Sequence, residues 1–136
     1  MLRHMSTRPR QVNWSILLQL VALGIGPVVT ALDWNYLKSL GPIQKVISDA
    51  AVSLLILGFI IWKMSLGRNW ARVTLLVLFL IGLPFYFFYI RAEIGRSAIL
   101  AALSVLQAIV QGAGLFLVFT DPAKDWFKKA AEAVSA

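Results

Sequence analysis

Long uncharged runs alternate with clusters of charge along this chain, and three of the runs are long enough to cross a bilayer as helices. Ser15 to Leu32 and Val73 to Ile90 each hold eighteen uncharged residues, and Ser97 to Thr120 holds twenty-four. Eighteen helical residues reach ~27 Å at about 1.5 Å each, close to the ~30 Å hydrocarbon core. The pattern therefore predicts spans at about 15–32, 73–90 and 97–120.

A further span is predicted between the first two of these, although its uncharged run is short. Only thirteen uncharged residues, Ala50 to Trp62, separate Asp49 from Lys63. The amine of Lys63 can extend to one membrane interface, and Pro42 can occupy a first helical position. We expect this span at about 44–64.

The end of the chain predicts a short helix at about 122–134. Asp121 is a good N-cap and Pro122 a good first residue. Trp126 and Phe127 belong to an apolar face opposite the lysines, which is typical of a helix lying on a membrane surface. Docking to a partner protein is the alternative for this helix. The predicted fold is an all-α integral membrane protein, a single membrane domain over 1–136 with four transmembrane helices and this amphipathic interfacial helix.

Composition agrees with a membrane protein and indicates its orientation. The chain is 60% hydrophobic and 14% charged, which excludes an ordinary soluble domain. With four spans, nine of the thirteen basic residues share one side, and basic segments stay cytoplasmic. Both termini are therefore predicted to be cytoplasmic. The nine are Arg3, Arg8, Arg10, Lys63, Arg68, Arg72, Lys124, Lys128 and Lys129.

The first span has a competing interpretation as a secretory signal peptide. The basic tail, the apolar stretch and Val29-Thr30-Ala31 together resemble a cleavage site. The stretch is long for a signal, so we expect it to be retained. Whether translation starts at Met1 or at Met5 leaves the predicted fold unchanged.

Polar and small residues mark one face on each of two spans. In a bilayer such faces turn toward other helices. We therefore expect the first and fourth spans to be neighbours, with glutamine amides bonding between helices; a substrate path is the alternative. The stripes are Ser15, Gln19, Ala22, Gly26, Thr30 and Asp33 in the first span, and Ser104, Gln107, Gln111 and Gly114 in the fourth.

Asp49 is the acidic residue that the predicted spans place nearest to membrane depth. Three interpretations stay open, because an acid inside a span is costly unless it is paired or wetted. It lies at the outer interface, it pairs with Lys45 one turn back, or it couples to a proton or cation. Asp49, Gln19, Gln107 and Gln111 are the candidate polar contacts between helices.

The connection between the predicted spans at 44–64 and 73–90 carries Arg68, Trp70 and Arg72. Arginine can hold a phosphate with two hydrogen bonds while tryptophan fixes depth, so we consider contact with anionic lipid headgroups, together with Arg8 and Arg10. The alternative is that these charges serve orientation alone.

Catalytic chemistry has little basis in this sequence. The chain has no cysteine and one histidine, His4, so no nucleophile with its base, no metal cluster and no cofactor motif can be assembled. We expect no enzyme, no cofactor and no metal. The net charge is +7, but the basic residues lie between apolar runs, so nucleic acid is not an expected partner.

Several short motifs resemble a known group of proteins. They are Arg8-Pro9, Leu32-Asp33-Trp34, Gly67-Arg68-Asn69-Trp70-Ala71-Arg72, Pro84, and Phe119-Thr120-Asp121-Pro122 ahead of Trp126-Phe127. The chain resembles uncharacterised small four-helix inner-membrane proteins of Proteobacteria. The resemblance implies this topology and the bacterial cytoplasmic membrane, and it implies no activity. Small multidrug transporters, of similar length, carry an essential glutamate in their first span, where this chain has only Gln19.

Three functions are consistent with these features. The leading one is a non-enzymatic accessory or interaction subunit that packs against itself or another membrane protein, as a homo-oligomer or in a larger complex. The second is a small proton- or cation-coupled transporter or channel-like oligomer that uses Asp49 and the glutamines. The third is an immunity protein against a pore-forming toxin.

Overall fold

The computed structural model describes residues 7–135, and these form six helices and no strand. The predictions that involve Arg3, His4 and the two candidate start residues lie outside the described residues. The helices are α1 (Arg10–Leu32), α2 (Trp34–Leu40), α3 (Ile43–Ser65), α4 (Asn69–Arg96), α5 (Ala98–Val118) and α6 (Asp121–Ser135).

Four of these helices are long and apolar enough to cross a membrane, namely α1, α3, α4 and α5. Their outward faces carry large apolar side chains that are more than half exposed, such as Leu55 and Phe88. Exposing such apolar faces to water is unfavourable, whereas lipid chains solvate them. The protein is therefore an all-α, multi-pass membrane protein, as the sequence predicts.

Two differences from the sequence-based elements affect the site described below. Helix α4 continues to Arg96, six residues beyond the predicted end at Ile90, because Arg91 and Glu93 end the uncharged run without ending the helix. Helix α2, which was not predicted, fills the first connection. It follows α1 after the single residue Asp33 and ends at Leu40, just before Gly41 and Pro42.

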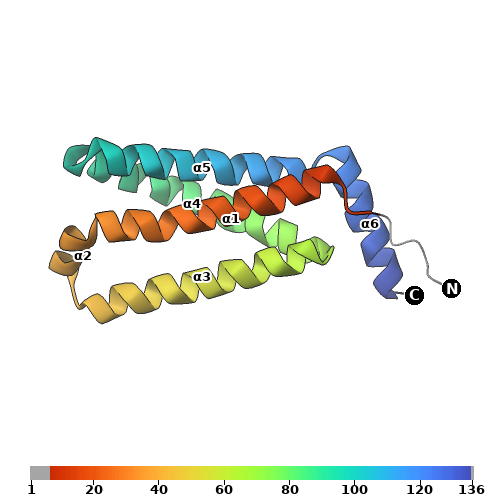
Figure 1. Cartoon of the computed structure of the whole chain (residues 1–136), viewed down its shortest axis with the longest axis horizontal. Helices are drawn as coiled ribbons and strands as arrows, with labels where there is room; N and C mark the ends of the chain where they lie inside the picture. Colours follow the sequence, from red (N-terminus) through yellow and green to blue (C-terminus); the bar gives the residue numbers. More distant parts are fainter. Residues whose placement is uncertain (1–6, 136) are drawn as a thin grey trace.

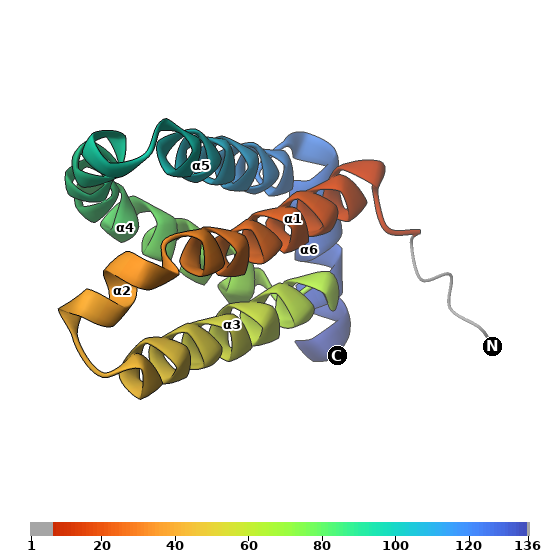
Figure 2. The same cartoon turned by 60° about the vertical axis from the view of Figure 1, so that its left-hand side comes forward.

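The four long helices run side by side, with α6 across one end and α2 at the other (Figure 1). We call these the α6 end and the α2 end. The most extensive helix pair is α1 with α5, and α4 packs on α5. Helix α3 meets α1 and α4 near the α6 end and diverges from α4 toward the α2 end (Figure 2). Its buried residues, Ile60, Ile61 and Met64, all belong to its last two turns.

Small residues allow the close approach of α1 and α5. The Ser15 hydroxyl donates to the Gly114 carbonyl at 2.6 Å, and Gln19 Nε2 donates to the Gln111 carbonyl at 3.0 Å. A Cβ on Gly114 would lie 3.0 Å from Gln19 Nε2 and 3.2 Å from the Leu18 Cβ. The polar stripes of these two spans therefore face each other, as expected from their spacing.

The core is concentrated at the α6 end. Val12, Met64, Leu75, Val118 and Phe127 are fully or almost fully buried there. Ala123 and Phe127 of α6 are fully buried, so the first turns of the apolar face of α6 are covered by the bundle, whereas Val134 near its end is 64% exposed.

The turn between α3 and α4 depends on Gly67. Its φ is +78°, and a Cβ at this position would lie 2.7 Å from the Ala130 Cβ of α6. Both the backbone conformation and the close approach of α6 therefore require glycine here.

Candidate functional site: a groove between the spans

The divergence of α3 leaves two adjoining spaces among the helices. The smaller is a cavity of about 220 Å³ between α1, α3 and α5, with Leu75 of α4 also in its wall. The larger is a groove of about 600 Å³ lined by all four spans. The two share the lining residues Gly26, Ser53, Leu57, Gln107 and Gln111.

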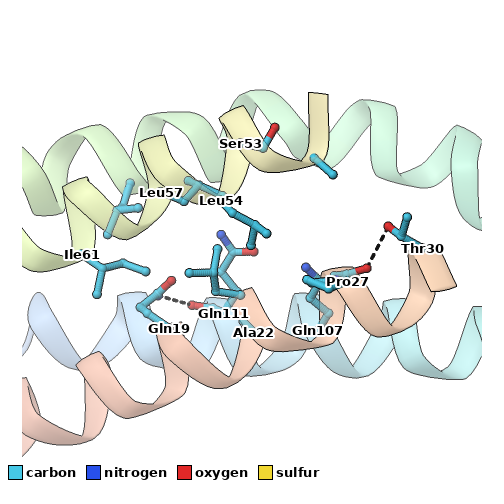
Figure 3. A pocket seen from close by; sticks show the side chains of 14 residues that line it. Gln19, Ala22, Pro27, Thr30, Ser53, Leu54, Leu57, Ile61, Gln107 and Gln111 are labelled. Carbon is cyan, nitrogen blue, oxygen red and sulfur yellow. Dashed lines mark hydrogen bonds between the residues drawn. The ribbon is translucent and has the colours of Figure 1, made fainter. Parts of the chain in front are cut away.

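The smaller cavity gathers the three glutamines of the bundle interior. Figure 3 shows Gln19, Gln107 and Gln111 on one side and the α3 residues Ser53 and Leu57 on the other. Only the Gln19 amide among the three makes a side-chain hydrogen bond within residues 7–135, to the Gln111 carbonyl. The amides of Gln107 and Gln111 are therefore hydrogen-bonding groups presented to the space between the helices.

The larger groove is mainly apolar and has a polar end. Ile56 and Leu57 of α3 and Leu83 of α4 contribute apolar walls. Ile56, Leu78 and Phe85 also line the groove while 51%, 42% and 65% exposed, so the groove opens at the outer surface of the bundle. Since α3 and α4 diverge there, the opening faces the lipid.

One face of α4 supplies the polar end of the groove. Gly82, Tyr86, Tyr89 and Glu93 follow steps of four, three and four, so they lie on one side of the helix and all line the groove. The missing side chain of Gly82 leaves open space, because nothing lies within 4 Å of a Cβ built there.

Glu93 is the buried carboxylate of this site. It is 7% exposed, and its carboxylate forms no hydrogen bond or ion pair with any other residue in the described part of the chain. The Tyr86 hydroxyl is also buried and has no hydrogen-bond partner there. Polar groups buried in a low dielectric are costly unless they are paired, so both groups favour a polar or charged ligand in the groove.

The basic residue one turn beyond Glu93 is already paired. Arg96 Nη2 lies 2.8 Å from Asp33 Oδ2, and the Arg96 guanidinium stacks 3.8 Å from the Tyr36 ring centroid. The side chains of Arg96 and Asp33 are 24% and 12% exposed. This pair links the end of α4 to the junction of α1 and α2, and no hydrogen bond or ion pair joins Arg96 to Glu93.

Asp49 lies away from both spaces. Its carboxylate accepts a hydrogen bond from Lys45 Nζ at 3.1 Å, and the two side chains are 66% and 75% exposed. The structure therefore shows the local ion pair that was one of three interpretations, and it places this pair on the outer face of α3.

The arginines considered for lipid contact divide into two groups. Arg8 donates to the Ser65 carbonyl at 2.7 Å, and Arg72 donates to the Val118 carbonyl at 2.9 Å. Both carbonyls belong to the last residue of a helix, where a positive charge is favourable. Arg10, Arg68 and Trp70 are exposed at the α6 end. Arg8 and Arg72 therefore join helices, while the other three remain available to headgroups.

Glu93 and the Asp33–Arg96 pair were missed by sequence reasoning. The segment from Arg91 to Arg96 was assigned to a connection because its charges interrupt the apolar run. A signal was present, since Tyr86, Tyr89 and Glu93 have helical spacing. Extending the helix by two turns would have placed Glu93 on the same face as the tyrosines.

Within residues 7–135 no group of three His, Cys, Asp or Glu side chains could hold a metal ion. Comparison with protein-family models, curated proteins and solved structures gives no match.

Proposed function

We propose that this chain is a non-enzymatic interaction protein of the bacterial cytoplasmic membrane, and that the groove is the surface at which it binds. This is the accessory role that the sequence predicts, with a location added. One observation carries the proposal: a groove between membrane spans that opens toward lipid and presents the Gln107 and Gln111 amides, the Tyr86 hydroxyl and Glu93.

The energetics of the bilayer support this proposal. Polar groups that face lipid are unfavourable, and polar groups that face another molecule can be satisfied. The α1–α5 pair uses its own polar groups, Ser15 and Gln19, in hydrogen bonds between helices. The groove residues are left for a second molecule.

The distribution of basic residues supports cytoplasmic termini. Arg10, Arg68, Lys124, Lys128 and Lys129 are exposed and lie at the α6 end or on α6 itself. Positively charged segments near span ends are retained in the cytoplasm. The α6 end then faces the cytoplasm, and the groove opens in the opposite half of the bilayer.

Site-specific photocrosslinking in native membranes tests the proposed binding surface. A benzoylphenylalanine is introduced at Ile56, which lines the groove, or at the neighbouring Leu55, which is 73% exposed. We expect the Ile56 probe to give a discrete adduct, protein or small molecule, by intact-mass spectrometry. The Leu55 probe should give lipid adducts only. Indistinguishable adducts at the two positions would refute a binding role for the groove.

Cation-coupled transport is the second candidate function, and Glu93 is the observation that favours it. A buried acid in a membrane protein commonly marks a substrate or ion path. The candidate acid is therefore Glu93 rather than Asp49. In proteoliposomes, Glu93→Gln should abolish cation-dependent flux while Asp49→Asn leaves it unchanged, and flux that survives Glu93→Gln would exclude this function.

A further inference from the structure

We infer that the groove binds a lipophilic organic cation, with one positive charge on an apolar body, and that Glu93 is its counter-charge. This inference rests on the proposed role of the groove as a binding surface. It adds the chemical class of the ligand, which neither the sequence motifs nor the comparisons indicate.

Charge complementarity is the first argument. Glu93 lines the groove, is more than nine-tenths buried, and has no ionic partner among residues 7–135. The Arg96 guanidinium is held by its 2.8 Å ion pair with Asp33, and the Arg96 Nε, although buried, makes no hydrogen bond to Glu93 or to any other described residue. A ligand that brings one positive charge to Glu93 satisfies the site without breaking that pair.

The aromatic residues of the groove supply the second argument. Tyr89 and Tyr86 lie one and two turns before Glu93 on the same face of α4, and Phe79 and Phe85 line the groove nearer the start of the helix. Aromatic faces attract organic cations, and the attraction increases when the cation is desolvated. Aromatic rings beside a buried carboxylate therefore form a site suited to an organic cation.

The dimensions and the entrance of the groove define the rest of the ligand. A space of about 600 Å³ with mainly apolar walls fits a small molecule with an apolar body, and it offers one carboxylate rather than the several oxygen ligands of a metal ion. The exposed rim residues Ile56 and Phe85 place the entrance toward lipid, where lipophilic molecules concentrate.

A phospholipid fits the groove less well than a simple cation. Its phosphate would bring a negative charge to the carboxylate of Glu93, and the nearby guanidinium of Arg96 is already engaged by Asp33. An anionic amphiphile has the same disadvantage without a compensating ammonium. The ligand class is therefore a cation that carries no anionic group.

Two probes of matched shape and opposite charge test the inference. The full chain is placed in phosphatidylcholine nanodiscs, and binding of radiolabelled tetraphenylphosphonium and tetraphenylborate is measured against empty discs. We expect saturable binding of the phosphonium and none of the borate. Equal binding of the two ions would overturn the inference, as would saturable binding of neither.

Variants then assign the charge to Glu93. Glu93→Gln should weaken phosphonium binding by about tenfold to a hundredfold, the loss typical of one contact to a charged group. Glu93→Asp should retain part of the affinity, and Asp49→Asn, which removes an exposed carboxylate, should retain all of it. Unchanged affinity in Glu93→Gln, or an equal loss in Asp49→Asn, would overturn the inference.

A fourth variant guards against a folding defect at Glu93. Ser53→Trp fills the groove from α3 and leaves Glu93 in place, so a monodisperse Ser53→Trp protein should also lose phosphonium binding. Full phosphonium binding by this variant would overturn the proposed location of the binding site in the groove. If the Ile56 photoprobe captures only a protein partner and no phosphonium binds, the ligand class fails while the proposed function stands. If the photoprobe captures nothing distinct and no phosphonium binds, both fail.

Discussion

The Ser15 hydroxyl of α1 donates a 2.6 Å hydrogen bond to the Gly114 carbonyl of α5, ninety-nine residues later in the chain. Ser15 is fully buried, and Gly114 is buried where the two backbones approach. This contact, with the Gln19 bond one turn on, fixes the pair of helices against which α3 and α4 pack. The groove exists because α3 does not close against that pair along its whole length.

Gly114→Ala should destabilise the bundle. The added Cβ would lie 3.2 Å from the Leu18 Cβ and 3.3 Å from the Ser15 carbonyl oxygen, so α1 must move away. We expect a loss of about 1–3 kcal/mol in the free energy of unfolding, as for other overpacked contacts. Thermal unfolding in detergent measures this. Gly24→Ala is the matched control, because nothing lies within 4 Å of a Cβ there, and equal stability of the two variants would contradict the prediction.

Gln19→Leu tests the hydrogen bond between α1 and α5. The substitution replaces the amide side chain with an apolar one of similar size and removes the 3.0 Å hydrogen bond to the Gln111 carbonyl. We expect a loss of about 0.6–2 kcal/mol, the range found for hydrogen bonds between membrane helices. Steric trapping or reversible denaturation in mixed micelles measures the difference. A variant as stable as the parent would show that the bond contributes nothing.

Asp33→Asn should loosen the α2 end. It leaves the largely buried Arg96 guanidinium without its anionic partner, at a cost of about 1–3 kcal/mol. Asp49→Asn breaks an exposed ion pair of similar length and should change stability by less than about 1 kcal/mol. Hydrogen exchange of α2 distinguishes the two variants. Equal protection of α2 in both would contradict a role for the Asp33–Arg96 pair.

Gly67→Ala should detach α6 from the bundle. Alanine is strained at a φ of +78°, and its Cβ would meet the Ala130 Cβ at 2.7 Å. The strain and the clash together should cost at least about 1–2 kcal/mol. Fluorescence of an introduced label at Ser135, or proteolysis of α6, reports the detachment. Undisturbed α6 packing in this variant would contradict the interpretation of the turn.

Uncharged runs were sufficient to predict the spans because a membrane helix must be apolar over a fixed length. The same criterion did not show that the helix of the third span continues past Ile90 to Arg96, since it detects the hydrocarbon boundary rather than the last hydrogen bond of the helix. The contact of the first and fourth spans was predictable from Ser15, Gln19, Gln111 and Gly114 because polar and small residues repeat at helical spacing.

The groove was less predictable, because it depends on how α3 is inclined. No local sequence pattern in α3 predicts that its buried residues are confined to Ile60, Ile61 and Met64. The partner of Arg96 was equally inaccessible, since Asp33 is sixty-three residues away in the chain and reaches it only through the bundle. Long-range relationships of this kind arise from packing rather than from periodicity.

The divergence of α3 from α4 is the central claim, and spin-label distances test it most directly. The chain has no cysteine, so pairs of labels can be introduced without background. One pair, at Ile47 and Phe88, spans α3 and α4 near the α2 end, and another, at Trp62 and Val73, spans them near the α6 end. We expect a clearly longer distance for the Ile47–Phe88 pair in lipid nanodiscs, and equal distances would show that the two helices run parallel and that the groove does not exist.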